Sequence, residues 1–372
     1  MAPKNRPPKG PARGASRKKP VTLKTLAQHL QLSPTTVSLV INRSPAASSI
    51  PPETHERVLA AARELNYRPN YMARSLRRQK SLSVGVIVPE ISEGYAGELL
   101  SGVEDHLMQA GYFYLVASHR SKEDVLEKYL DLLRDRLVEG YILLATPISH
   151  SLPLPTVAVA GHEEIAGVTN VVIDHDHAMD QALSHLVELG HQRIAFFKGH
   201  PNSADTEDRW RAILEGADRH GLEIDPNLTL QLSGDPAGEV FSPDEAYREG
   251  YVFGRKLLER SSDFTTLFAF NDISAIGATR AFLDAGFRVP EDISVVGFDD
   301  IQSAAFHNPS LTTVRQPLRE MGRMAAEILL RNLAGETTSS EPVMVKPELV
   351  VRDSTAPPRT KAATKPHRPL SA

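Results

Sequence analysis

Three segments near the amino end carry apolar residues at the spacing of one helical face. The apolar positions are Leu23, Leu26, Ala27 and Leu30 in the first segment, Val37, Val40 and Ile41 in the second, and Val58, Leu59, Ala62 and Leu65 in the third. Thr22 and Ser33 precede the first two segments, and a hydroxyl there can accept a hydrogen bond from a free backbone N–H. Pro34 suits the first position of a helix. The pattern predicts a three-helix unit over residues 21–67, whose third helix begins near Pro52.

From Leu82 onward the pattern changes to short, nearly continuous apolar runs separated by amphipathic segments. The runs are 84–89, 113–117, 140–145, 157–160, 171–173, 194–197, 228–230, 267–270 and 295–298. Such runs are typical of strands buried on both faces, and strands that alternate with helices indicate parallel sheets. The sequence therefore predicts an α/β core of two doubly wound, parallel-sheet lobes, with a ligand cleft at the carboxyl ends of the strands.

Charge divides the chain into a basic amino end and an acidic body. Residues 1–80 contain 16 Lys and Arg and three acidic residues, a net charge of +13, whereas the remainder has a net charge of −17. This asymmetry favours a polyanion partner at one end, although a basic solubilising tail would also contribute to it. Residues 1–20 and 354–372 have the composition of disordered tails.

Several classes of protein are excluded by what the sequence lacks. It has no cysteine, which removes disulfides, thiol catalysis and thiolate metal sites. There is no run of 18 apolar residues, and the basic amino end has no apolar stretch behind it, so we expect neither a membrane span nor a secretory signal. These features favour a cytoplasmic protein, associated with the chromosome if it binds DNA.

The second predicted helix has the character of one that enters DNA. A short helix, a turn and a second helix form the helix-turn-helix pattern. Thr35, Thr36, Ser38 and Asn42 offer short hydrogen-bonding side chains, which fit a groove without crowding the base edges. Thr35 is the strongest candidate for base contact. For Thr36 and Ser38, helix packing and capping are the alternatives.

Ten short motifs, taken in order, resemble those of the lactose-repressor/galactose-repressor (LacI) family of bacterial transcription regulators. They are Val21–Leu23, Leu26–Ala27, Ser33–Asn42, Leu65–Asn70, Ala73–Leu76, Gly85–Pro89, Gly190–Ile194, Phe270–Asp272, Ile293–Asp299 and Leu311–Pro317. The resemblance runs from about Val21 to Val351. It implies an operator-binding homodimer, most simply a repressor, controlled by a sugar or related polar metabolite. Both an inducer and a co-repressor are compatible with it.

The resemblance also implies a division of the chain. Residues 68–80 would be a hinge helix and linker, and residues 81–353 a two-lobed core like that of periplasmic sugar-binding proteins. The chain would cross between lobes near residues 173, 315 and 342. The lobes would then be about 81–173 with 316–342, and about 174–315 with 343–353.

For DNA, the resemblance implies a hinge helix whose leucine wedges into the minor groove; Leu76 matches that leucine. A basic linker is the alternative for this segment. Leu39 departs from the polar or basic residue common at its position, but it can pack on a thymine methyl. The residues expected at DNA are Thr22, Ser33, Thr35, Thr36, Ser38, Leu39, Asn42, Tyr67, Asn70, Ala73, Arg74 and Leu76.

The effector cleft is expected where polar residues follow predicted strands. Asp299 ends one strand, Asn271 and Asp272 end another, and Tyr95 lies beyond the first strand in the opposite lobe. Arg209 matches an arginine that the family uses for ligand contact. Together they resemble a polar ring with an aromatic platform, which suits a sugar or nucleoside. Helix capping is the alternative for Asp272, and surface exposure for Arg209.

No catalytic residue, cofactor or metal is expected. His175 and His177 share a face if they lie on a strand, but no third ligand has a clear position. An enzyme is the less favoured reading because no phosphate-binding glycine loop and no nucleophile elbow occurs. A ligand-binding receptor without DNA function is also compatible with the core, but not with the helix-turn-helix.

Overall fold

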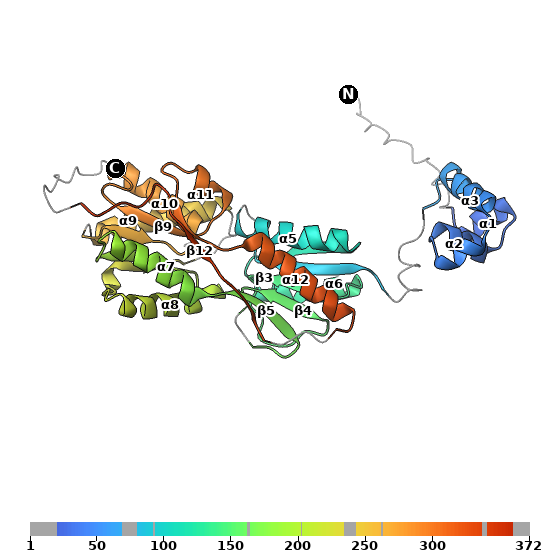
Figure 1. The fold of residues 1–372 in the computed structure, drawn as a ribbon, viewed down its shortest axis with the longest axis horizontal. Helices are drawn as coiled ribbons and strands as arrows, with labels where there is room; N and C mark the ends of the chain where they lie inside the picture. The colour runs from blue at the N-terminus through green and yellow to red at the C-terminus, as the bar shows by residue number, and fades with distance from the viewer. Residues whose placement is uncertain are drawn as a thin grey trace, which may run out of the picture. The chain divides into compact units, whose positions relative to one another are not determined.

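The computed structural model describes residues 21–68, 80–91, 94–161, 164–201, 203–233, 243–261, 263–336 and 341–359. The chain divides into two compact units, Met1–Ser81 and Leu82–Ala372, and each is described by itself (Figure 1). Residues 1–20, 360–372 and most of the expected hinge lie outside the described residues. Within the described ranges, no helix is both long and apolar enough to cross a membrane.

The amino-terminal unit has the expected three helices. They are α1 (Leu23–Leu30), α2 (Pro34–Ile41) and α3 (Pro52–Glu64), with a short 3-10 helix η1 (Pro45–Ser49) before α3. Both predicted caps are confirmed, because the backbone N–H of Thr25 donates to Thr22 Oγ1 at 3.2 Å and that of Thr36 donates to Ser33 Oγ at 3.0 Å. The caps satisfy backbone groups that a helix leaves without partners in its first turn.

The inner face of α3 differs by one position from the expected one. Val58 is fully buried and Ala61 and Ala62 nearly so, whereas the Leu59 side chain is 44% exposed. Placing Leu59 inside was wrong because adjacent residues point about 100° apart on a helix. The buried face follows the i, i+3, i+4 and i+7 positions from Val58, which end at the partly buried Leu65.

The larger unit contains two six-stranded sheets, which confirms the two-lobed α/β prediction. The first sheet has the order β11 (Val343–Val345), β5 (Val168–Ile173), β4 (Thr156–Val159), β3 (Tyr141–Leu144), β1 (Ser83–Val88) and β2 (Phe113–Ser118). The second has the order β12 (Glu348–Val350), β10 (Thr312–Arg315), β9 (Ser294–Asp299), β8 (Thr266–Phe268), β6 (Ile194–Lys198) and β7 (Thr229–Gln231). Neighbouring strands are parallel except β10 and β12.

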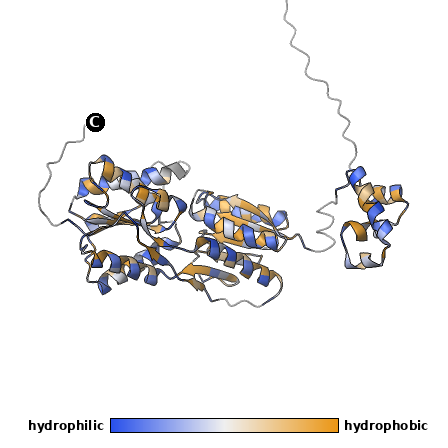
Figure 2. Ribbon diagram, turned by 45° about the horizontal axis from the view of Figure 1, so that its top comes forward, coloured by the Kyte–Doolittle hydropathy of each residue, from blue (hydrophilic) through white to orange (hydrophobic). Residues whose placement is uncertain are grey.

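Helices cover both faces of each sheet, as parallel strands require. The first lobe has α5 (Tyr95–Gln109), α6 (Glu123–Asp135) and α12 (Leu318–Leu333). The second has α7 (His175–Glu188), α8 (Asp205–Arg219), η2 (Pro226–Leu228), α9 (Pro243–Arg260), α10 (Asp272–Asp284) and α11 (Gln302–Phe306). Orange and blue residues alternate along the helices in Figure 2, as expected of helices that cover a sheet with one apolar face.

The third crossing between lobes lies later than expected. β11 pairs with β5, and the backbone N–H of Asp174 donates to Val345 O at 2.9 Å. The crossing therefore falls between Val345 and Glu348, and assigning residues 343–345 to the second lobe was wrong. Met344 is 63% exposed. An edge strand of three residues is too short for its apolar residues to reveal which sheet it joins.

The carboxyl-terminal tail also begins later than its composition indicates. Ser354 is 1% exposed, and its hydroxyl donates to Val295 O at 2.6 Å. The same hydroxyl accepts from the Thr312 backbone N–H at 2.8 Å. Expecting disorder from residue 354 was therefore wrong for residues 354–359. Composition does not report such hydrogen bonds to the edge of a sheet.

Two glycines allow α5 and α12 to pack closely in the first lobe (Figure 1). A Cβ added at Gly102 would lie 1.9 Å from Arg319 O, and one added at Gly322 would lie 2.0 Å from Leu99 O. Both clashes are with backbone atoms, which cannot turn aside as a side chain can. The two helices therefore touch along a contact that a methyl group would break.

Gly322→Ala is expected to destabilise the core, although alanine in an uncrowded helix is favoured over glycine by about 1 kcal/mol. Overpacking against backbone should lower the free energy of unfolding by about 1–3 kcal/mol, measured by urea denaturation. Gly216→Ala in α8 is the control, because its added methyl would meet the tip of the Leu183 side chain. Equal stabilities for the two variants would contradict the tight backbone contact.

Candidate functional site

Helix α2 presents the expected DNA-contacting side chains in two different ways. Ser33 and Thr35 are exposed at its amino end, and Thr36 and Leu39 are half-exposed. Ser38 is 9% exposed and turned inward. The Asn42 side-chain amide donates to Ser38 O at 2.8 Å, so these two residues bond within the helix. The first turn of α2 is therefore the part that remains available to a partner.

The remaining residues expected at DNA lie on either side of α2. Thr22 caps α1 and is exposed at the surface of the unit. Tyr67 follows α3, with its ring partly buried against the core of the amino-terminal unit. The hinge candidates lie outside the described residues; they are Asn70, Ala73, Arg74 and Leu76. Their roles stay predictions from the sequence.

In the second unit, Arg209, Asp299 and Tyr95 meet between the lobes. Asp299 is the last residue of β9, Arg209 lies in the second turn of α8, and Tyr95 begins α5 of the other lobe. Arg209 is 3% exposed and Asp299 7% exposed. Charged groups buried this deeply need partners, because removing them from water is costly.

The guanidinium of Arg209 is held in one plane by several contacts. It lies between the rings of Phe270 and Phe298, with Cζ 4.4 and 3.7 Å from the two centroids. One terminal nitrogen donates to Phe270 O at 2.6 Å and the other to Asp205 Oδ2 at 3.3 Å. Its buried Nε has no hydrogen-bond partner among the described residues. Two rings and two acceptors thus fix the side chain while one donor stays available.

Asp205 joins this cluster although the sequence did not single it out. His175 Nε2 lies 3.4 Å from Asp205 Oδ1, so the carboxylate bridges Arg209 and His175. The signal for Asp205 was its position four residues before Arg209. Such i, i+4 pairs are also common on exposed helix faces, so spacing alone does not reveal a buried pair.

Asp299 is the acidic centre of the cleft. Its backbone φ is +111°, a conformation that L-residues rarely adopt. Gln316 Nε2 donates to its carboxylate at 2.7 Å. Burial raises the pKa of Asp299 to about 7; Arg209 and the Gln316 hydrogen bond oppose this rise, and Asp205 adds to it. Gln316 belongs to a motif noted in the sequence but had been given no role.

Tyr95 contributes from the opposite lobe. Its hydroxyl is covered and has no hydrogen-bond partner among the described residues. Burial, followed by the charges of Asp205 and Asp299, raises the pKa of this phenol well above its usual value. The lobes touch here, since a Cβ added at Gly94 would lie 2.8 Å from Ile301 Cγ2. The phenol is therefore a neutral donor that faces two carboxylates.

Asn271 and Asp272 lie close by but hold the fold together. The Ser274 backbone N–H donates to Asn271 Oδ1 at 2.9 Å, so Asn271 caps α10 and Asp272 does not. Asp272 is fully buried. Its carboxylate accepts from Thr313 Oγ1 at 2.6 Å and from the Ile301 backbone N–H at 2.9 Å. Burial and then the charge of Asp299 raise its pKa well above the usual value.

Asp174, His175 and His177, which had been considered as a strand-borne metal motif, open helix α7 instead. Asp174 Oδ1 accepts from the His177 backbone N–H at 2.9 Å, which makes Asp174 the cap of α7. His175 turns toward Asp205. Within the described ranges, no group of three His, Asp or Glu side chains is arranged to hold a metal ion.

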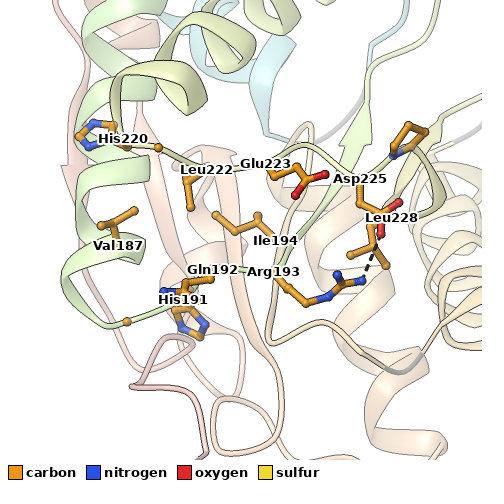
Figure 3. A pocket seen from close by; sticks show the side chains of 13 residues that line it. Val187, His191, Gln192, Arg193, Ile194, His220, Leu222, Glu223, Asp225 and Leu228 are labelled. Carbon is orange, nitrogen blue, oxygen red and sulfur yellow. Dashed lines mark hydrogen bonds and ion pairs between the residues drawn. The ribbon is translucent and has the colours of Figure 1, made fainter.

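Two cavities differ in position and in chemistry. One of about 80 Å³ lies at the carboxyl ends of the first sheet's strands and includes Thr146, Asn170 and, from the other lobe, Ala204. A larger depression of about 620 Å³ lies where β6 begins (Figure 3). There Arg193 pairs with Asp225 at 3.1 Å, and His191 bonds through both ring nitrogens. It lies at the amino end of β6, whereas effectors bind at the carboxyl ends of the strands in such sheets.

Comparison with known proteins extends over nearly the whole chain. Residues 22–70 match the family described as bacterial regulatory proteins, lacI family, and residues 183–355 match the periplasmic binding protein-like domain. The transcriptional repressor PurR of Haemophilus influenzae is 31% identical over 344 residues, which cover 90% of this chain and 98% of the relative.

Solved structures agree in fold. The lac repressor dimer bound to operator and the anti-inducer ONPF has a TM-score of 0.79 at 26% identity, with 91% of this chain and 100% of that chain covered. The complex of the transcriptional regulator CelR with cellobiose has a TM-score of 0.64 at 29% identity, with 90% and 99% covered. The chain belongs to the LacI family of bacterial regulatory proteins, a family of DNA-binding transcription regulators rather than enzymes.

Proposed function

We propose that this protein is a repressor that binds operator DNA as a homodimer and whose affinity for DNA is set by a small polar metabolite. The metabolite would bind between the two lobes of the core, against Tyr95, Arg209 and Asp299. The protein would act on chromosomal DNA in the bacterial cytoplasm. This proposal extends to the present chain what the similar proteins are named for: operator binding by a dimer and complexes with sugars.

The observation that carries the proposal is the meeting of Tyr95, Arg209 and Asp299 at one point between the lobes. Arg209 and Asp299 are buried, and the covered Tyr95 hydroxyl and Arg209 Nε lack partners in the described part of the chain. Buried donors of this kind are costly unless something completes their hydrogen bonds. A polar ligand would do so, and by contacting both lobes it would favour one lobe orientation over another.

A receptor without DNA function is the less favoured alternative. It would need only the core, whereas this chain also has two capped helices in a helix-turn-helix arrangement with an exposed first turn on α2. The basic residues of the first 80 positions suit a phosphate backbone. We therefore assign DNA contact to Thr22, Ser33, Thr35, Thr36 and Leu39, and propose Tyr67 and the hinge residues as their continuation.

Binding to the DNA upstream of the protein's own gene tests the proposed function. We expect specific retardation of that fragment over random DNA, with affinity falling about a thousandfold between 50 and 200 mM salt if six or more phosphates are contacted. Gel shifts at several salt concentrations measure both quantities. A protein that retards both fragments equally at every salt concentration is not a sequence-specific repressor.

Thr35→Ala should weaken binding to that specific fragment by about 1–3 kcal/mol, because it removes a base-edge contact. Binding to random DNA should change little, since phosphate contacts remain. Thr54→Ala in α3 is the matched control and should leave both affinities unchanged. Equal loss on both DNAs would show that Thr35 contacts phosphate and does not read sequence.

Reciprocal coupling distinguishes regulation from ligand binding alone. We expect an effector to raise the melting temperature of the core and to change the protein's affinity for operator DNA by some factor. Operator DNA must then change the protein's affinity for the effector by the same factor. Calorimetry with and without the operator fragment measures the second factor. A ligand that stabilises the core but binds equally tightly with and without operator DNA would contradict effector control.

A further inference from the structure

This inference rests on the proposed function, because it concerns the chemistry of the metabolite in the same cleft. Its starting point is the unusual position of the Asp299 carboxylate. Asp299 is 7% exposed. Within the described residues, its carboxylate accepts one hydrogen bond, from the neutral amide of Gln316, and makes no ion pair. A buried carboxylate with one hydrogen bond and no direct ion pair is disfavoured unless another group completes the site.

The carboxylate of the next residue, Asp300, has both hydrogen-bond and ion-pair partners within the fold. Asp300, whose side chain is 8% exposed, accepts from Arg315 Nε at 2.7 Å and from an Arg352 terminal nitrogen at 2.6 Å. Two adjacent aspartates, both well buried, thus differ completely in their partners. Two guanidinium groups bond directly to Asp300, whereas none bonds directly to Asp299.

The nearest cation is already engaged elsewhere. The two terminal nitrogens of Arg209 donate to Phe270 O and to Asp205 Oδ2. Arg209 is close enough to favour the ionised form of Asp299, but its direct hydrogen bonds go to these other acceptors. The cleft therefore contains two carboxylates, Asp205 and Asp299, around one guanidinium that is bonded to the first of them.

Donors without partners are the second, independent feature of the cleft. The Tyr95 hydroxyl and Arg209 Nε are covered, and neither has an acceptor in the described residues. A ligand that completes this site must therefore offer acceptor oxygens or nitrogens to these donors. It must also offer a donor to Asp299, so it carries both kinds of group.

We propose that the effector presents a protonated amine to Asp299 and hydroxyl or carbonyl oxygens to Tyr95 and Arg209. An amino sugar or another small polar amine has this chemistry. In a site of low dielectric, an ammonium donates a charge-assisted hydrogen bond to the carboxylate. This bond is stronger than the one that a neutral hydroxyl donates. Phosphorylated and carboxylated metabolites are disfavoured, because they would bring a second anion toward Asp205 and Asp299.

Proton linkage gives this proposal a specific signature. The groups that face Asp299 are Asp205 and Arg209 of α8, Asp272 of α10, Tyr95 of α5 and Gln316 of the second crossing. Burial in this surrounding raises the pKa of Asp299 to about 7. Part of the population therefore holds a proton there near neutral pH, and an ammonium that pairs with the carboxylate expels it.

The experiment uses the purified full-length chain and pairs of compounds that differ by an amine and a hydroxyl. The pairs are D-glucosamine with D-glucose, D-galactosamine with D-galactose, and putrescine with 1,4-butanediol. We expect at least one amine to raise the melting temperature and to bind tenfold or more tightly than its hydroxyl partner. Calorimetry at pH 7 in two buffers of different ionisation enthalpy should then show that the Asp299 carboxyl releases protons when the amine binds.

Two variants assign the preference to Asp299. Asp299→Asn keeps the shape of the side chain and should abolish both the preference for the amine and the proton release. It should fold, since it removes a buried carboxylate that lacks an ion pair. Asp292→Asn is the control, because Asp292 bridges Arg288 and Arg359 outside the cleft at 2.9 and 2.6 Å. That variant should keep the preference.

The proposal is overturned if no amine of the series binds more tightly than its hydroxyl partner. It is also overturned if Asp299→Asn keeps the preference, or if the amine binds without releasing protons. Gel shifts on the upstream fragment are measured separately. Loss of DNA binding with the amine preference intact would count against the proposed repressor function and leave this inference standing.

Discussion

The turn Asp299–Asp300 is the constraint on which the core depends. Both residues have positive φ, +111° and +57°, and conformations of this kind cost about 1–3 kcal/mol each for residues other than glycine. The turn is held by its surroundings: Asp272 accepts from the Ile301 backbone N–H, and Asp300 accepts from Arg315 and Arg352. In this conformation the Asp299 carboxylate lies near Arg209 and Tyr95.

The same contacts tie the cleft to the segments that cross between lobes. Arg315 is the last residue of β10, directly before the second crossing, and it also lies 3.6 Å from Glu348, the first residue after the third. Gln316, within the second crossing, donates to Asp299. In the proposed function, a ligand that pulls on Asp299 therefore acts on two of the three connections between lobes. A ligand can shift the orientation of the lobes when its contacts differ between the two orientations, and contacts to the crossing segments can differ in this way.

Local features were predictable from the sequence, and features set by distant residues were not. The caps Thr22 and Ser33 and the existence of the strands follow from rules that act within a few residues, and the structure confirms them. Burial on both faces was wrong for β2, which lies at the edge of its sheet and has no buried residue. The order of the strands, the sheet that β11 joins and the partners of Ser354 depend on residues far away in the chain. Asp299 was predicted from its place at the end of a strand and Arg209 from the family resemblance, whereas the contribution of Asp205 became visible only when burial could be measured.

The aspartates around the cleft show why residue type alone does not assign a site. Asp272, Asp299 and Asp300 all follow or adjoin strand ends, and all are well buried. Asp272 and Asp300 each receive two donors from the fold, so their oxygens have little capacity left for a ligand. Asp299 receives one. A carboxylate can bind a ligand when the fold leaves some of its hydrogen bonds unmade. Whether it does so depends on the residues around the aspartate and not on the residue type alone.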